Sequence, residues 1–564
     1  MTGKSAIIIG SGFGALGSAC LLAKAGWNVT VLEKNDQLGG RAGFFEVNQD
    51  TDGSWKDVPE AVIGDEMQGG NEDRSEAVRS STVSENRRDN AAEGHPRRED
   101  SSWGKDRAKN CFRFDMGPSW YLMPDVFEHF FELLGEDVNK HLKLKKLSPS
   151  YRIFYKDTFL KVDIHSDLAK DLKTIEQMET GAGPALESYL DQAGYQYTVA
   201  KDRFMYKNYD SIKDFFTREM ATEGRKLNVL SNMDKHVKKY FKSDAMQKLM
   251  QYPLVFLGSS PYNTPAIYNI MSHIDFNMGV YYPDSGIYEI VKALQKIAEK
   301  HGAKFVTDCA VEKIIVENGQ AVGVKTSGGE QRADIVISNA DIHHTETQLL
   351  DPEYRTKSDR YWQKRTMAPS ALIIYLGVKG KIPELTHHNL LFSKDWKKNF
   401  SEIFDKPRWP KDPSLYICNP SKTDSSVAPN EHENLFVLVP IASDLNYDDA
   451  LLEDYSDKIL QTIEKHMYVK DLRERIVFKK LFSVKDFETR YNSYKGSALG
   501  LAHTLKQTAV FRPNNISKKV KNLYYVGAGT NPGIGMPITL ISAELMYKRL
   551  INDKSSGPLK PEQL

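Results

Sequence analysis

The sequence predicts an α/β fold in which a parallel sheet with a βαβ unit is interrupted by a second domain of mixed sheet and helices. Strand and helix patterns alternate over residues 5–46, as a βαβ unit requires. Residues 523–540 return to a strand, a glycine-rich turn and a helix. Because the two ends carry elements of the same type, we expect them to share one domain, with the middle of the chain inserted between them.

The first turn of the βαβ unit carries the glycine motif Gly10-Ser11-Gly12-Phe13-Gly14-Ala15, between an apolar strand and an apolar helix. Gly10 permits the tight turn, Gly12 lets the backbone approach a pyrophosphate, and Ala15 is small enough for helix and strand to pack closely. The helix N-terminus offers free N–H groups and a positive dipole end to phosphates. These features predict a Rossmann-like dinucleotide site.

A second predicted strand, residues 28–32, ends in Glu33, whose carboxylate can accept hydrogen bonds from a ribose diol. The motif Asp36-Gln37-Leu38-Gly39-Gly40-Arg41-Ala42 follows shortly afterwards. Its glycines admit close contact with a cofactor, and Arg41 offers a forked cation to an anionic linker.

The C-terminal region contains another glycine-rich turn, residues 527–535, between a strand and a helix that begins at Met536-Pro537. Proline suits the first turn of a helix. The N-terminus of this helix can stabilise negative charge on a cofactor. Glycine sites at opposite ends of the chain together predict one large cofactor.

The domain boundaries follow from these motifs and from the change of pattern between them. The predicted segments are the N-terminal parts of the Rossmann-like domain (1–47 and 111–124), a disordered hydrophilic insert (48–110), a mainly helical substrate domain (125–285), a return to the Rossmann-like domain (286–345), a substrate domain of sheet and helices (346–490) and a C-terminal cofactor-binding segment (491–564).

The insert, residues 48–110, has many charged and few aliphatic residues, so it cannot bury enough apolar area to offset its ordering entropy. The strands on each side, 43–47 and 111–115, look like two arms of one hairpin. Lengthening a hairpin tip from roughly 4 to 64 residues costs only ~2.4 kcal/mol of closure entropy, which the fold can tolerate.

Charge, cysteine content and apolar runs exclude several classes of protein. Lys and Arg total 76 against 75 Asp and Glu, without the basic excess of a nucleic-acid binder. The four scattered cysteines predict neither a disulfide framework nor a zinc site, and they favour a reducing compartment. The sequence shows no secretory leader, and no apolar run approaches the ~18–20 residues of a spanning helix. We therefore predict a cytoplasmic protein that at most lies on a membrane.

Four further stretches resemble the bacterial phytoene desaturase family of FAD-dependent, amine oxidase-like flavoproteins. They are residues 114–120, 281–287 and 334–341, and the region from Tyr491-Asn492 through Gly496-Ser497-Ala498 to Phe511-Arg512-Pro513. With the cofactor motifs, the resemblance covers nearly the whole chain apart from 48–110. One departure is Asn531, where this family usually has His, although Asn also offers a donor and an acceptor. The insert is a second departure.

The resemblance implies an FAD-dependent carotenoid desaturase that introduces double bonds into phytoene or a similar long polyene. The flavin would take a hydride from an allylic carbon while a proton leaves the neighbouring carbon. Reduced FAD would then pass electrons to a quinone or to oxygen. Nothing in the sequence indicates which residue receives the proton, so no catalytic residue is predicted, and no metal site is predicted either.

Other functions stay open beside this one. A carotene isomerase, a saturase or a terminal oxygenase of the same family would share the cofactor motifs. Flavin-linked amine oxidases often carry a covalent-attachment Cys near the C-terminal motif, whereas no Cys follows Cys418 here. A non-catalytic prenyl-lipid carrier of the same fold is a fourth reading, but such proteins have lost FAD binding, and the intact glycines and Arg41 argue against it.

The predicted cofactor-binding residues come from the glycine motifs and from the stretches that resemble the family. They are Gly10, Gly12, Phe13, Gly14, Ala15, Glu33, Lys34, Gly40, Arg41, Gly117, Pro118, Ser119, Val311, Gly527, Gly529, Met536 and Pro537. A hydrocarbon has no polar handle, so its recognition rests on tunnel shape and apolar area, at ~25 cal/mol per Å². Candidate tunnel residues, for which plain core packing is the alternative, are Tyr252, Pro253, Phe256, Tyr281, Tyr282 and Pro283.

An insoluble substrate must be loaded from a bilayer, so peripheral contact with a membrane surface is expected. Segment 392–404 places Phe392, Trp396, Phe400 and Ile403 or Phe404 on one helical face, with three lysines elsewhere. Residues 235–242 form a second basic cluster. Basic amphipathic helices can lie at an anionic lipid surface. The alternative is an ordinary surface helix whose apolar face packs inward.

Overall fold

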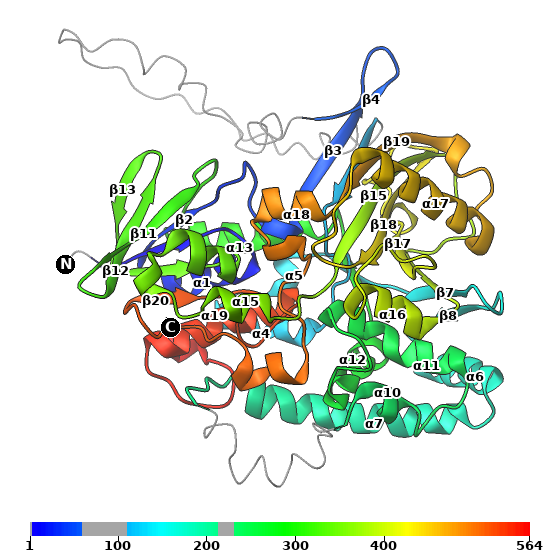
Figure 1. Ribbon diagram of the computed structural model, residues 1–564, viewed down its shortest axis with the longest axis horizontal. Helices are drawn as coiled ribbons and strands as arrows, with labels where there is room; N and C mark the ends of the chain where they lie inside the picture. The colour runs from blue at the N-terminus through cyan, green and yellow to red at the C-terminus, as the bar shows by residue number, and fades with distance from the viewer. Residues whose placement is uncertain (1–2, 59–109, 212–230) are drawn as a thin grey trace.

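A parallel sheet organises the half of the molecule that holds both chain ends (Figure 1). The computed structural model describes residues 3–58, 110–211 and 231–564. The strand order of this sheet is β10 (Lys304–Val306), β2 (Asn28–Leu32), β1 (Ser5–Ile9), β14 (Ile335–Ser338) and β20 (Leu523–Tyr525), and every neighbouring pair is parallel. The predicted βαβ unit and the return of the C-terminal segment to the same sheet are confirmed.

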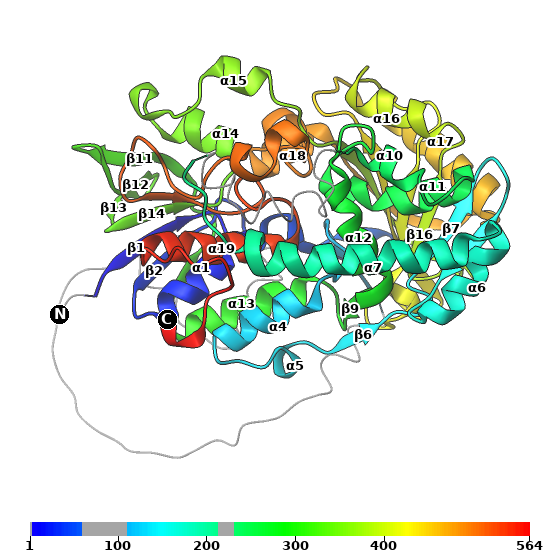
Figure 2. The same cartoon turned by 90° about the horizontal axis from the view of Figure 1, so that it is seen from below.

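The parallel sheet is buried on both faces, which explains why its strands are apolar throughout rather than alternating. Ala6 and Ile8 face a helical layer, while Ile7 and Ile9 face the opposite layer. The helical layer contains α1 (Phe13–Lys24), α13 (Tyr288–Lys300) and α19 (Met536–Leu550), and Figure 2 shows α1 beside α19. The opposite layer is the antiparallel sheet β11 (Val311–Glu317), β12 (Gln320–Thr326) and β13 (Gly329–Arg332).

A second sheet organises the other half of the molecule (Figure 1). Its order is β19 (Ile476–Phe482), β15 (Ser370–Lys379), β18 (His432–Ile441), β17 (Leu415–Cys418), β16 (His388–Phe392), β7 (Tyr151–Tyr155) and β8 (Lys161–Ile164). On β15, Leu372 and Ile374 belong to a core shared with α17 (Asp449–Met467), whereas Ile373 and Tyr375 belong to an aromatic core on the other face. This alternation is what a strand covered by two different layers requires.

The segment predicted to be mainly helical, residues 125–285, contains both helices and strands. Its helices are α4 (Pro124–Leu133), α5 (Val138–His141), α6 (Leu168–Met178), α7 (Ala182–Ala200), α10 (Met233–Val237), α11 (Asp244–Gln251) and α12 (Ile270–His273). However, β7 and β8 join the second sheet, and β6 (Leu144–Lys146) pairs with β9 (Tyr281–Pro283). The run Tyr151–Tyr155 is rich in aromatic residues, which favour strands, so this mainly helical segment also supplies strands to the sheets.

The strands that flank the hydrophilic insert pair as predicted, with β3 (Phe44–Gln49) antiparallel to β5 (Cys111–Asp115). The predicted start of the insert at residue 48 is wrong, because β3 continues to Gln49 and β4 (Trp55–Asp57) pairs back onto it. Trp55 packs against Phe112, with ring centroids 4.6 Å apart, so this extension is anchored to the aromatic core of the second sheet. Residues 59–109 of the insert lie outside the described residues.

All four cysteines are free. Among the helices that lie in the described ranges, none combines the length and the apolar character needed to cross a membrane.

Candidate cofactor and substrate site

One cavity of about 980 Å³ extends from the edge of the parallel sheet into the aromatic core of the second sheet. Its volume lies at the upper end of the roughly 300–1,000 Å³ that is usual for ligand pockets. Every predicted cofactor residue except Ala15 lines this cavity. Ala15 lies in the first turn of α1 and is fully buried, and its small side chain serves packing. Residues from the two ends of the chain therefore meet in one site.

The two glycine turns touch each other through Gly14 and Gly527. A Cβ at position 14 would lie 2.9 Å from the backbone nitrogen of Gly527 and 3.1 Å from the side-chain nitrogen of Asn339. Asn339 donates a hydrogen bond to the carbonyl of Val526 at 3.1 Å, so it clamps the C-terminal turn to the N-terminal one. Asn339 was not among the predicted cofactor residues. Asn339 directly follows β14, a buried strand that lies parallel to β1. This position at the end of an apolar strand is the feature of the sequence that could have indicated it.

Glu33 sits at the end of β2, at the edge of the cavity, and only 4 % of it is exposed. One carboxylate oxygen accepts hydrogen bonds from the backbone nitrogen and the hydroxyl of Ser11, at 2.9 and 2.6 Å. The other accepts from the backbone and side-chain nitrogens of Asn35, at 2.9 and 2.8 Å. These four donors fix the negative charge beside the first glycine turn, where a ribose is predicted.

Arg41 is a half-buried cation beside the glycine turns, and desolvation lowers its pKa. One terminal nitrogen donates to the hydroxyl of Ser493 at 2.7 Å, and the guanidinium lies over the ring of Tyr491. Its Nε is buried without a hydrogen-bond partner among the described residues. A Cβ at Gly117 would lie 2.6 Å from the carbonyl oxygen of Arg41, so only glycine permits this approach. An unpaired guanidinium nitrogen between glycine turns fits the anionic linker of FAD.

The C-terminal turn is held from behind by a polar network. The backbone nitrogen of Gly527 donates to the hydroxyl of Ser542 at 3.1 Å, and the hydroxyl of Thr530 donates to the carbonyl of Gly527 at 3.0 Å. The side chain of Asn515 also donates to Ser542, at 3.0 Å. These hydrogen bonds fix the shape of the turn, which ends at the N-terminus of α19.

The far part of the cavity is lined by aromatic and aliphatic side chains. Of the predicted tunnel residues, Tyr252 and Phe256 line it, but Pro253, Tyr281, Tyr282 and Pro283 do not. The prediction is wrong for residues 281–283 because they form β9, which pairs with β6 away from the cavity. Lining residues that the sequence did not indicate include Trp120, Tyr268, Leu390, Phe392, Trp396, Tyr416 and Phe436.

A short polar chain interrupts the apolar wall. The hydroxyls of Ser119 and Tyr416 lie 2.7 Å apart, and the Tyr416 hydroxyl lies 2.7 Å from Nδ1 of His388. Trp120 stacks on the His388 ring with centroids 4.3 Å apart. Because β16 is antiparallel to β17, His388 lies opposite Cys418, and ligand-capable atoms of His387, His388 and Cys418 lie within 4.8 Å of one another. The spacing of these three residues along the sequence does not reveal that their side chains lie together.

A buried carboxyl lies behind the tunnel wall at Asp275. One of its oxygens accepts hydrogen bonds from the hydroxyls of Tyr151 and Tyr252, at 2.7 and 2.8 Å. Its other oxygen is buried without a partner among the described residues. Burial raises the pKa of Asp275 to about 7, although the two tyrosine hydroxyls act in the opposite direction.

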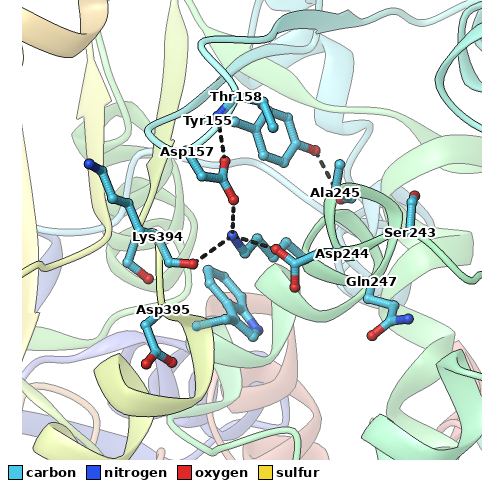
Figure 3. A network of polar contacts seen from close by, with 12 residues as sticks. Tyr155, Asp157, Thr158, Ser243, Asp244, Ala245, Gln247, Lys394 and Asp395 are labelled. Carbon is cyan, nitrogen blue, oxygen red and sulfur yellow. Dashed lines mark hydrogen bonds and ion pairs between the residues drawn. The ribbon is translucent and has the colours of Figure 1, made fainter.

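The segments predicted to lie on a membrane pack inward instead. In α16 (Trp396–Phe404), the side chains of Trp396, Phe400 and Ile403 are buried, and Val237 and Phe241 are buried in the second basic segment. The buried ammonium of Lys248 links the segments that surround α16. It contacts Asp157 at 2.9 Å, Asp244 at 2.6 Å and the Lys394 carbonyl at 3.1 Å (Figure 3). The predicted apolar membrane faces are therefore part of the core.

Comparisons with known proteins agree with this site. A family model described as "Flavin containing amine oxidoreductase" matches residues 101–545, and one described as "NAD(P)-binding Rossmann-like domain" matches residues 8–58. The chain is 42 % identical to carotenoid 3,4-desaturase of Haloarcula japonica, over 98 % of this chain and 99 % of that one. It is 30 % identical to the zeta-carotene-forming phytoene desaturase of Myxococcus xanthus, over 97 % and 94 %.

Solved structures resemble this chain in fold, but their sequence identities are too low to support any statement about its function. Putrescine oxidase bound to putrescine matches with a TM-score of 0.56 at 12 % identity, over 98 % of both chains. An oxidoreductase from Methanosarcina mazei matches with a TM-score of 0.51 at 16 % identity, over 96 % of this chain and 98 % of that one. Together with the cofactor motifs, the match over residues 101–545 shows that the chain belongs to the flavin-containing amine oxidoreductase family and is an FAD-dependent oxidoreductase.

Proposed function

We propose that this chain is a carotenoid desaturase that introduces double bonds into phytoene or a similar long polyene. The observation that carries the proposal is the single cavity, in which glycine turns from both chain ends open directly into a wall of aromatic and aliphatic side chains. Two full-length relatives are named for desaturation of carotenoids, which supports the same substrate class.

In the proposed reaction, FAD would supply the acceptor for a hydride from an allylic carbon, a proton would leave the neighbouring carbon, and a double bond would form between the two carbons. The sixteen predicted residues that line the cavity would hold the cofactor. Arg41 would hold the anionic linker, and Glu33 would hold the ribose. The N-terminus of α19 and the turn before it lie where positive potential favours a negatively charged ring system.

The aromatic part of the cavity would orient the polyene and exclude water. Phe256 packs against Trp120 and Tyr252, with ring centroids 5.3 and 6.0 Å apart. A hydrocarbon gains free energy here only by burying apolar area, at ~25 cal/mol per Å², so selectivity depends on shape. Among the described residues that line this wall, none offers a carboxylate to an ammonium group, and Asp275 lies behind the wall.

The mouth of the cavity is the proposed point of contact with a membrane. Leu505 and Phe511 line the cavity, and yet they are 44 % and 50 % exposed. Lys506 lies between them in the chain and is exposed. Exposed apolar side chains next to a cation suit an anionic bilayer surface, from which an insoluble polyene would enter. We propose a quinone or oxygen as the electron acceptor.

Pigment analysis tests the proposed function. The chain is expressed in cells that accumulate phytoene, and the carotenoids are separated by chromatography. New products with longer conjugation are expected, and unchanged phytoene would contradict phytoene as the substrate. Changed geometry without loss of hydrogen would indicate an isomerase, loss of double bonds a saturase, and added oxygen an oxygenase. A colourless protein without bound flavin would indicate a carrier.

A further inference from the structure

Arg512 is a buried cation whose charge the mechanism above does not use. Only 3 % of it is exposed, and burial lowers its pKa to about 10, so it remains charged at neutral pH. Among the described residues, no carboxylate forms an ion pair with it. The three ionisable side chains that interact with it electrostatically, Tyr268, Tyr361 and His503, are neutral near pH 7, because burial raises the pKa of the two tyrosines and lowers the pKa of His503 to about 3.

The guanidinium of Arg512 donates to four backbone carbonyls. Nε donates to Thr530 at 3.0 Å, and Nη2 donates to Ala528 at 2.5 Å. Nη2 and Nη1 also donate to Leu501 at 3.2 Å and to Gln507 at 3.3 Å. Thr530 and Ala528 belong to the C-terminal glycine turn, whereas the other two belong to the preceding loop. One side chain therefore fixes the turn from behind.

Carbonyl dipoles solvate this cation, but no negative charge neutralises it within the described structure. Burial of an unneutralised charge is costly, so its retention here needs a compensating partner. The opposite face of the same turn, at Gly527, Ala528 and Gly529, lines the cofactor cavity. A hydride brings two electrons and one proton, so a flavin that accepts one gains a negative charge. In a low-dielectric interior, a cation across one turn stabilises that charge more strongly than it would in water.

We propose that Arg512 is a positioning residue that holds the C-terminal turn against FAD and raises the reduction potential of the bound flavin. The inference rests on the FAD assignment and not on a polyene as substrate. A failure to desaturate phytoene would therefore not contradict the proposed role of Arg512.

The test compares Arg512→Gln with Arg512→Lys in the purified, FAD-loaded protein. The reduction potential is measured by equilibration with a reference dye under anaerobic conditions. Arg512→Gln removes the charge and should lower the equilibrium constant for reduction about tenfold, which is about 30 mV for a two-electron couple. Arg512→Lys keeps the charge but cannot reach all four carbonyls, so its potential should stay near the wild-type value while FAD dissociates more readily.

Lys521→Gln is the matched control, because it removes an exposed cation just before β20, the strand that leads into the same turn. Lys521→Gln should change neither the reduction potential nor the dissociation of FAD. Sulfite, which adds to flavins as an anion, gives a second readout that works in excess FAD if Arg512→Gln holds the cofactor weakly. Sulfite affinity should fall about tenfold in Arg512→Gln alone. Equal loss of FAD from both Arg512 variants, with wild-type potentials and sulfite affinities, would overturn the electrostatic role.

Discussion

The two halves of the cavity are built by opposite means. The cofactor half consists of backbone turns, glycines and a few fixed charges, as at Gly14, Glu33 and Arg41. The tunnel half consists of large side chains from many separate strands and turns, such as Trp120 and Phe256. Phosphates and riboses are recognised by donors and acceptors at defined points, whereas a hydrocarbon is recognised by shape alone. The difference predicts that changes in one half should leave the other half working.

The largest effect is expected from Gly14→Val, which should break the cofactor half. A Cβ at this position would lie 2.9 Å from the backbone nitrogen of Gly527, and backbone cannot yield as a side chain can. Overpacking of 1–3 kcal/mol lowers FAD affinity about 10- to 100-fold, measured by fluorescence titration of the apo-protein. The control Gly328→Ala meets only the Thr326 hydroxyl, at 3.7 Å, and should bind FAD normally. Normal FAD binding by Gly14→Val would contradict the contact between the two chain ends.

The second prediction concerns the carboxyl behind the tunnel wall. The pKa of Asp275 is raised from 3.8 to about 7 in the folded protein, so the folded state holds the proton more tightly than the unfolded chain. The stability that it contributes is complete below pH 3.8 and is lost as the pH rises through about 7. Asp275→Asn keeps an acceptor for both tyrosines and does not titrate.

Urea unfolding at pH 5 and pH 8 measures this contribution. The wild-type free energy of unfolding should fall by about 1–3 kcal/mol more than that of Asp275→Asn. The exposed Asp137, which caps α5, provides the control Asp137→Asn, because Asn also caps helices and should leave the wild-type difference unchanged. Parallel pH profiles for wild type and Asp275→Asn would disprove the buried proton.

The third prediction separates the halves directly. Phe256→Ala removes part of the aromatic wall, so kcat/KM for the polyene should fall about tenfold, as the loss of 1–2 kcal/mol of apolar burial implies. The flavin content, read from visible absorbance, should not change. Phe159→Ala is the control, because Phe159 is 57 % exposed and does not line the cavity. A loss of FAD from Phe256→Ala would show that the two halves are not independent.

The smallest effect is expected at the cavity mouth. Leu505→Ser and Phe511→Ser together should lower binding to vesicles that contain anionic lipid about fivefold, since each loses about 0.5 kcal/mol of apolar contact. Flotation with vesicles measures this. Leu451→Ser, at an exposed position on α17, should leave binding unchanged. If the double variant floats like the wild type, the mouth is not the membrane contact.

The sequence predicted the cofactor half far better than the tunnel half, for a physical reason. A dinucleotide needs contiguous residues at the ends of strands, so the motifs at Gly10–Ala15 and 527–537 are visible in one dimension. Tunnel residues converge only through strand register, as when Leu390 comes to lie opposite Tyr416. Local pattern could not show that Tyr281–Pro283 pairs away from the cavity, at β9.

Amphipathic patterns were also ambiguous. The apolar face of 392–404 has the spacing of either a lipid-facing or an inward-packed helix, and only the tertiary structure shows that Trp396 and Phe400 are buried. In contrast, Leu505 and Phe511 belong to short turns without helical periodicity, so the exposed mouth had no signal in the sequence.

A single-turnover experiment tests the central claim that one cavity brings flavin and polyene together. The FAD-loaded protein is mixed with the polyene in the absence of oxygen and quinone, and absorbance is followed over time. The visible band of oxidised flavin should bleach while the polyene spectrum shifts to longer wavelength, with one new double bond for each flavin reduced. The opposite result is a flavin that stays oxidised while the protein holds a polyene, when other assays show that the protein desaturates this polyene. That result would contradict the claim that one cavity brings flavin and polyene together.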